Sequence, residues 1–198
     1  MTNVNRRTVL AMSGASLIAT AFPVRALTPQ SAMDLVNQVV DTLNTIINSG
    51  KPEAAMYKDF EKLFADYADV EIISRYTLGA DARSMSASDL KKYKAAFQGY
   101  MARKYGKRFR EFIGGYVKVR GAKRVKSFVE VQTVARLSGT SPFEVSFHVS
   151  DKGGSEKFFN MYIEGVNLLL TERTEIQAML DKRNGNLDKM IQDLQKAG

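Results

Sequence analysis

Hydrophobic residues recur every three or four positions through the first half of the chain, which is the spacing of amphipathic helices. Thr28 can cap the first of these helices, and the turn-forming residues 48–50 end it. A second helix covers the apolar positions from Met56 to Tyr67. Asp69 can cap a short third helix that runs towards Leu78. The pattern therefore predicts three helices in this part of the chain.

A longer fourth helix is predicted to begin at Ser86 and Asp89, which have the spacing of a capping box. Its apolar side is rich in aromatic residues and comprises Leu90, Tyr93, Phe97, Met101, Tyr105, Phe109 and Phe112. Periodicity alone favours ordinary core packing for this aromatic side. A second interpretation, in which the same side contacts an apolar ligand, remains open.

After Gly114 the pattern changes to an alternation of apolar and polar residues, which indicates β-strands. Four such runs, at 116–120, 129–137, 143–149 and 159–163, are separated by turn-forming residues. Short turns between alternating runs are typical of an antiparallel sheet with one apolar face. His148 falls on the polar side of its run, so we expect it to be exposed on a strand.

The chain ends in two further helical patterns, separated by Gly185, which can end the first of them. Their apolar positions are Leu169, Ile176, Met179 and Leu180, then Leu187, Met190, Ile191 and Leu194. The predicted order is helices, a four-stranded antiparallel meander, and helices again, which is an α+β domain. The chain has 198 residues, enough for one compact domain, which we expect to span residues 27–198.

Residues 1–26 have the parts of an export signal. Arg6 and Arg7 precede a weakly apolar stretch of about 14 residues, and residues 24–26 form a small-x-small cleavage site. The stretch around the two arginines resembles a twin-arginine signal, although the general secretory route remains open. An uncleaved anchor is disfavoured, because a spanning helix needs about 20 apolar residues. We therefore expect cleavage near Ala26 and a soluble protein in the periplasm.

Charge and composition exclude several classes of function. The formal net charge is +8, and removal of the three arginines in the first 26 residues leaves +5. No nucleic-acid-binding motif accompanies these charges, so nucleic-acid binding is disfavoured. The chain has no cysteine and one histidine, which argues against disulfides, zinc sites and most Ser–His or Cys–His catalysis. Without a phosphate-binding loop or metal motif, the sequence suggests no cofactor and no metal.

Three segments resemble the MlaC-like toluene-tolerance family. The run from Asn160 to Leu168, followed by Arg173 and Glu175, is similar to the D-V-x-I-E-G-V-S-L and R-x-E-F segments of that family. Residues 74–79 with Arg83 resemble its L-G-x-x-W-R segment, and the aromatic helix resembles its F…F…Y helix. The likeness covers roughly residues 30–196. The chain departs from these patterns at four positions, which are Ala82, Asn160, Asn167 and Ile176.

The resemblance implies an NTF2-like fold, in which a curved sheet and several helices enclose a deep apolar cavity for acyl chains. It also implies a phospholipid ligand and a shuttle without enzymatic activity. The expected partners are an outer-membrane lipoprotein–porin complex and an inner-membrane ABC lipid transporter with its lipid-binding subunit, and the expected role is to maintain outer-membrane lipid asymmetry. The residues expected to line the cavity are Phe97, Met101, Tyr105, Phe109, Val131, Val145, Phe147, Phe159, Met161 and Ile163.

Two other functions remain open. A periplasmic carrier of another apolar ligand, such as a sterol-like lipid or a solvent molecule, would have a cavity of different shape. An NTF2-like enzyme would need a general acid or base inside its pocket, whereas the carboxylates on the predicted strands point away from the apolar face. The basic residues Arg103, Lys104, Lys107 and Arg108 could meet anionic headgroups or a docking partner, but a solvated helix face is the favoured interpretation.

Overall fold

The computed structural model describes residues 26–109, 111 and 113–198, with the side chain of Phe109 outside the description. The predicted export signal therefore lies almost wholly outside the described residues. Within the described ranges, no helix is both long and apolar enough to cross a membrane.

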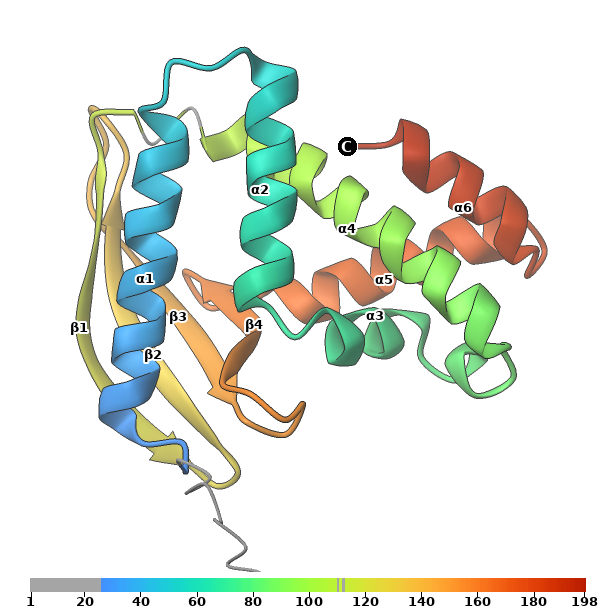
Figure 1. Ribbon diagram of the computed structural model, residues 1–198, viewed down its shortest axis with the longest axis horizontal. Helices are drawn as coiled ribbons and strands as arrows, with labels where there is room; N and C mark the ends of the chain where they lie inside the picture. The colour runs from blue at the N-terminus through green and yellow to red at the C-terminus, as the bar shows by residue number, and fades with distance from the viewer. Residues whose placement is uncertain (1–25, 110, 112) are drawn as a thin grey trace, which may run out of the picture.

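In the described ranges, four helices and the short 3-10 turn η1 come before the sheet (Figure 1). They are α1 (Pro29–Ile47), α2 (Glu53–Tyr67), α3 (Val70–Leu78), η1 (Asp81–Arg83) and α4 (Ala87–Phe109). Thr28 caps α1 through a capping box with Ser31, and the Asp69 side chain accepts a hydrogen bond from the Ile72 N–H at the start of α3. The four predicted helices are thus confirmed; α4 is described as far as Phe109, and the predicted end at residue 112 lies outside the described residues.

The sheet is an antiparallel meander of five strands in chain order, not four. Its strands are β1 (Tyr116–Val125), β2 (Phe128–Arg136), β3 (Phe143–Ser150), β4 (Lys157–Ile163) and β5 (Val166–Asn167). Glu164 and Gly165 have φ values of 48° and 80°. Positive φ at both central positions is what a type I′ hairpin turn requires. This turn folds the chain back for the two residues of β5, a run too short for alternation to reveal.

Two bulges interrupt the strand register. The first lies in β1, between Val119 and Gly121. In the second, Val149 pairs with Phe158 and His148 pairs with Asn160, so Phe159 is the additional residue of β4. Uninterrupted alternation had placed Phe159 on the same face as Met161 and Ile163, and this is wrong because the bulge shifts the strand by one residue.

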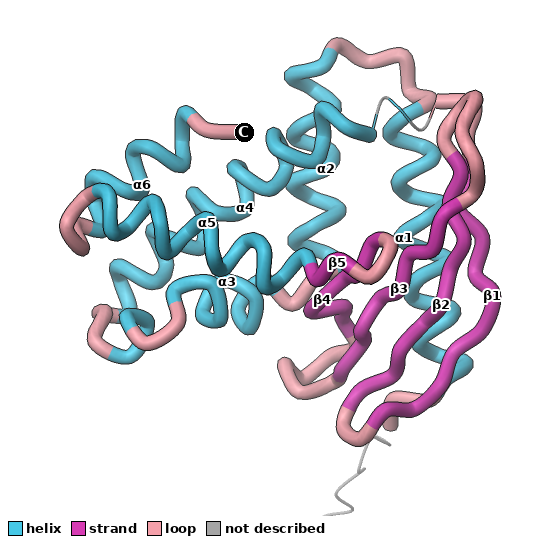
Figure 2. Tube along the Cα trace, turned by 180° about the vertical axis from the view of Figure 1, so that it is seen from behind, coloured by secondary structure: helices cyan, strands magenta, loops and turns pink. Residues whose placement is uncertain are grey.

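Helix α1 lies over one face of the sheet, whereas α3, α5 and α6 lie beyond its β4–β5 edge (Figure 1). We call the face that carries Val131, Val145 and Phe147 the inner face, because α1 packs on β1 and β2 there. Figure 2 shows the opposite, outer face with no helix over it. Beyond α1, helix α2 packs against α4, and α4 packs against α6. The hydrophobic core therefore forms between the inner face and the helices.

The C-terminal helices begin at asparagine caps. Asn167 accepts a hydrogen bond from Leu170 N–H at the start of α5 (Leu168–Lys182), and Asn186 does the same for α6 (Leu187–Lys196). Gly185, with a φ of 76°, lies between the two helices, as the sequence predicts. Because α5 follows β5 directly, its position is fixed relative to the β4–β5 hairpin. The α+β class is thereby confirmed.

Strand β1 forms one edge of the sheet, since β2 is its partner on the other side. Its ten residues include four bases and no acid, namely Lys118, Arg120, Lys123 and Arg124. Lys123 forms an ion pair with Glu130 of β2, and an Arg124 guanidinium N–H donates a hydrogen bond to the Leu27 carbonyl. The outer edge of the strand is therefore strongly basic.

Candidate functional site

The residues expected to line a cavity come from α4 and the inner face of the sheet. Phe97, Val131, Val145 and Phe147 belong to one buried cluster, against which Met101, Met161 and Ile163 pack. Phe159 also packs against this cluster, although its ring lies 5.7 Å from that of Phe128 and 5.8 Å from that of His148, between ring centroids. Phe109 lies in α4, but its side chain is outside the described part of the chain. Most of the expected residues are thus brought together.

This apolar interior is closed. Phe97 and Val131 have no exposed surface, and Val145 and Phe147 are 7% and 6% exposed. A surface hollow of about 450 Å³ lies on the outer face, where Arg120, Gln132 and His148 are among the lining residues. In this conformation Phe97 and Val131 are fully covered by their neighbours, so a ligand can contact them only after those neighbours move.

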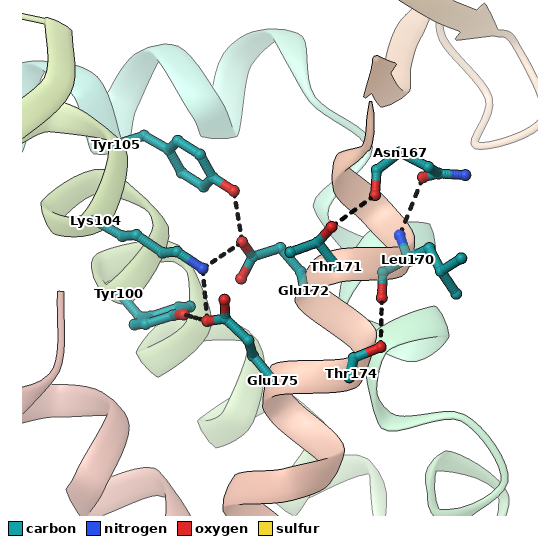
Figure 3. A network of polar contacts seen from close by, with 9 residues as sticks. All are labelled: Tyr100, Lys104, Tyr105, Asn167, Leu170, Thr171, Glu172, Thr174 and Glu175. Carbon is teal, nitrogen blue, oxygen red and sulfur yellow. Dashed lines mark hydrogen bonds and ion pairs between the residues drawn. The ribbon is translucent and has the colours of Figure 1, made fainter. Parts of the chain in front are cut away.

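A polar cluster joins α4 to α5 beside this interior (Figure 3). Glu172 is only 1% exposed, and its Oε1 accepts hydrogen bonds from Lys104 Nζ at 2.7 Å and Tyr105 OH at 2.5 Å. Lys104 Nζ also lies 2.6 Å from Glu175 Oε2, which accepts a second hydrogen bond from Tyr100 OH at 2.8 Å. We call Tyr100, Lys104, Tyr105, Glu172 and Glu175 the α4–α5 cluster.

Sequence reasoning missed Glu172, although a signal was present. Leu169, Glu172 and Ile176 are three and four residues apart, so they share one face of α5. Because Leu169 and Ile176 mark the apolar face of that helix, an acid between them has to be buried. In the sequence, Glu172 looks like the many other acids on helix surfaces, so it was not singled out.

The cluster shifts the acidity of its members. Burial, and next the charge of Glu172, raise the pKa of Tyr100 and of Tyr105 well above the ordinary value, so both hydroxyls remain donors. Burial also acts to raise the pKa of Glu175, but the hydrogen bonds from Lys104 and Tyr100 outweigh it and leave that pKa below its usual value. Glu175 therefore carries a negative charge at neutral pH.

The cluster offers a buried carboxylate, which an enzymatic function would need. One oxygen of Glu172 is engaged by Lys104 and Tyr105, and the other has no hydrogen-bond partner among the described residues. Neither the outer-face hollow nor a smaller hollow of about 130 Å³ at Phe128 includes Glu172. Within the described ranges, no group of three or more His, Asp or Glu residues could hold a metal ion. The arrangement is that of an ion pair between two helices.

Arg103, Lys104 and Lys107, near the end of α4, make contacts within the described part of the chain. Arg103 donates hydrogen bonds to the carbonyls of Leu194 and Ala197, and Lys107 donates one to Gly198. Lys104 belongs to the α4–α5 cluster. These contacts hold the end of α6 against α4, which favours the structural interpretation of this basic stretch.

His148 is half-buried, not exposed as its position on a polar strand face suggested. Its ring stacks on Phe128 at 4.4 Å and lies 4.9 Å from the ring of Tyr162, between centroids. Burial lowers the pKa of His148, and the charge of Glu130 opposes this shift only partly. The outer face therefore carries a small aromatic layer formed by three strands.

Comparisons with known proteins identify a family and similar solved structures. A family model described as MlaC protein matches residues 36–196. The fold is also similar to the crystal structure of a phospholipid-binding protein from Ralstonia solanacearum in complex with a phospholipid, with a TM-score of 0.70 and 17% sequence identity. That alignment covers 83% of this chain and 95% of the other. None of the curated proteins matches the chain.

Proposed function

We propose, because this chain belongs to the MlaC protein family, that it is a soluble carrier that binds phospholipid in the apolar interior between its sheet and helices. The family match over residues 36–196 carries the proposal, since it runs from within α1 to the end of α6. The fold that this chain shares with a phospholipid-bound protein supports it.

The chemistry of the ligand sets a physical condition for this function. Two acyl chains have about 30 methylene groups, and exposing them to water costs about 0.8 kcal/mol each, or roughly 25 kcal/mol in all. A shallow groove cannot offset that cost, so the carrier has to enclose the chains. Since the inner face is covered and its residues are buried, binding requires the helices to move away from the sheet. The lining would then include Phe97, Val131 and Phe147.

Membership of the MlaC family also supports a proposal about where the carrier works and with which partners. We propose that the protein is exported, loses its signal near Ala26, and works in the periplasm. It would pass phospholipid between an outer-membrane lipoprotein–porin complex and an inner-membrane ABC transporter with a lipid-binding subunit, and so maintain outer-membrane lipid asymmetry. No catalytic step is part of this role.

Native mass spectrometry of the purified protein, followed by lipid extraction, tests phospholipid binding directly. We expect a mass increment that resolves into intact phospholipids. Increments that match sterol-like lipids or solvent molecules would instead support the alternative carrier function. If the protein mass is unchanged even after incubation with phospholipid vesicles, the proposal is wrong.

A pair of tryptophan variants tests where the acyl chains lie. The chain has no tryptophan, so one introduced residue is a unique fluorescent reporter. Met161 pairs with Phe147 of the inner face, whereas its neighbour Tyr162 pairs with Ser146 on the outer face. We expect phospholipid with brominated acyl chains to quench Met161→Trp strongly and Tyr162→Trp little. Equal quenching of the two variants would place the chains elsewhere.

A further inference from the structure

The α4–α5 cluster has the composition and position of a headgroup subsite. We propose that Lys104, Glu172 and Glu175 bind the headgroup of the phospholipid and that they select a zwitterionic headgroup with a primary ammonium. This inference rests on the proposed function, because it assigns a ligand chemistry to the polar end of the same site.

The cluster leads from the surface to the interior. The side chain of Glu175 is 45% exposed, that of Lys104 is 24% exposed, and that of Glu172 is 1% exposed. On α4, Met101 lies one turn before Tyr105, and Phe97 lies one further turn into the core. Acyl chains beside Phe97 and Met101 would therefore leave the headgroup at the three charged residues. A phospholipid needs this order of apolar interior and polar mouth.

The charges of the cluster are unequal. Two carboxylates face one ammonium, and Oε2 of Glu172 is buried without a hydrogen-bond partner among the described residues. A buried acceptor without a donor is rare and costs free energy. What the cluster lacks is a further cation that carries N–H groups. A primary ammonium supplies both the charge and the hydrogen-bond donors.

A zwitterionic headgroup can replace the present contacts without changing the net charge of the cluster, because it brings one cation and one anion. Its ammonium would take the place of Lys104 Nζ between Glu172 and Glu175, and the released Lys104 would pair with the phosphate. A lysine side chain is long and flexible enough for this exchange. An anionic headgroup without an ammonium would draw Lys104 away and leave both carboxylates without a cation.

The contact between the two helices at this point depends on side chains. Helix α4 packs its backbone closely against α2 and α6, and α5 packs against α3 and β4, whereas α4 and α5 make few close backbone contacts. The side chains of the cluster form the bridge between them (Figure 3). A ligand that exchanges these ion pairs thus acts where the helices are least tightly packed. Arg103 and Lys107 cannot replace Lys104, because they bind the carbonyl groups at the end of the chain.

A competition experiment tests the subsite. The purified protein is incubated with phosphatidylcholine vesicles that contain equal amounts of phosphatidylethanolamine and phosphatidylglycerol. The protein is re-isolated, and native mass spectrometry measures the bound lipid classes. We expect phosphatidylethanolamine to exceed phosphatidylglycerol by on the order of tenfold, the ratio that one charge-assisted hydrogen bond supplies. The bound amount of phosphatidylcholine, relative to its share of the vesicle lipid, should fall between those of the other two lipids, because its quaternary ammonium has the charge but no N–H.

Two variants connect this selectivity to the cluster. Glu172→Gln places an amide N–H₂ where the free carboxylate oxygen lies, and Glu175→Gln removes the more exposed charge; both should bring the ratio close to one. Glu144→Gln, on an exposed carboxylate of β3, makes the same change of charge away from the cluster and should keep the ratio of the unchanged protein. Circular dichroism verifies that each variant is folded. If Glu172→Gln does not fold, Glu175→Gln still tests the subsite, because Glu175 is more exposed.

The outcomes separate the two proposals. Capture of phospholipid without preference for the primary ammonium, or a preference that survives in both variants, overturns the headgroup subsite and leaves the carrier function intact. If the unchanged protein captures no phospholipid of any class, the carrier function itself is wrong, and the subsite with it.

Discussion

Replacing Lys104 by methionine measures how strongly the α4–α5 cluster stabilises the fold. Methionine keeps an unbranched side chain but removes the ammonium, 2.7 Å from Glu172 Oε1 and 2.6 Å from Glu175 Oε2. Glu172 then keeps only the Tyr105 hydroxyl as a donor among the described residues. Removing one partner of a buried ion pair costs about 3–5 kcal/mol. Since the Lys104 side chain is 24% exposed, water recovers part of this, and we expect a loss of about 2–3 kcal/mol in the free energy of unfolding.

Urea denaturation followed by circular dichroism measures this loss. For a slope of about 2–3 kcal/mol per molar urea, the midpoint should fall by about 1 M. Lys62→Met is the matched control, because Lys62 is 75% exposed and its ion pair with Asp66 should contribute little to stability. Combining Lys104→Met with Glu172→Gln should recover much of the loss, since the uncompensated charge is then absent. Equal midpoints for the two lysine variants, or additive effects in the double variant, would refute the reasoning.

Two further predictions concern α4 and the outer face. At Gly106 an added Cβ would lie 2.7 Å from a ring carbon of Tyr57, so overpacking of about 1–3 kcal/mol should exceed the helix propensity gained by Gly106→Ala. At Gly99 the nearest atom is a guanidinium nitrogen of the flexible Arg103 side chain at 3.0 Å, so Gly99→Ala should raise stability by up to about 1 kcal/mol. Thermal unfolding measures both variants. If both alanines raise stability, or both lower it, the packing argument is contradicted. The folded-state pKa of His148 lies below 6.5 because the ring is buried, so the unfolded chain binds the proton more readily and stability should fall as the pH drops through 6.5. His148→Phe should remove this part of the pH dependence in urea titrations between pH 7.5 and 5, and an unchanged dependence would exclude the histidine as its cause.

Local signals in the sequence were enough to predict the regular elements. Thr28, Asp69 and Ser86 cap the helices that they were expected to begin, because a cap depends only on residues within one turn. The alternation of Val129 and Val131 placed the inner face correctly, since one buried face enforces a period of two. Where the structure depends on contacts within a few residues, the sequence was informative.

Features that depend on distant contacts were not predicted. The bulge at Phe159 follows from pairing with β3, which reverses the face that its own strand pattern predicts. Glu172 is paired with Lys104, 68 residues earlier in the chain, so its burial has no local signature beyond the helix face. Periodicity also cannot distinguish a packed core from a ligand cavity, because both place apolar residues such as Phe97 on the same side. The expectation of a cavity came from the family resemblance and not from the hydrophobic pattern.

Strand β1 also affects how copies of this chain meet one another. An edge strand of ten residues has unpaired backbone groups that could extend the sheet into a second molecule. Here the bulge between Val119 and Gly121 distorts that edge, and four positive side chains would be brought close to four others in any antiparallel or parallel pairing of two copies. Edge-to-edge pairing of two copies is thereby disfavoured by charge and by shape together, even though one face of the sheet carries no helix.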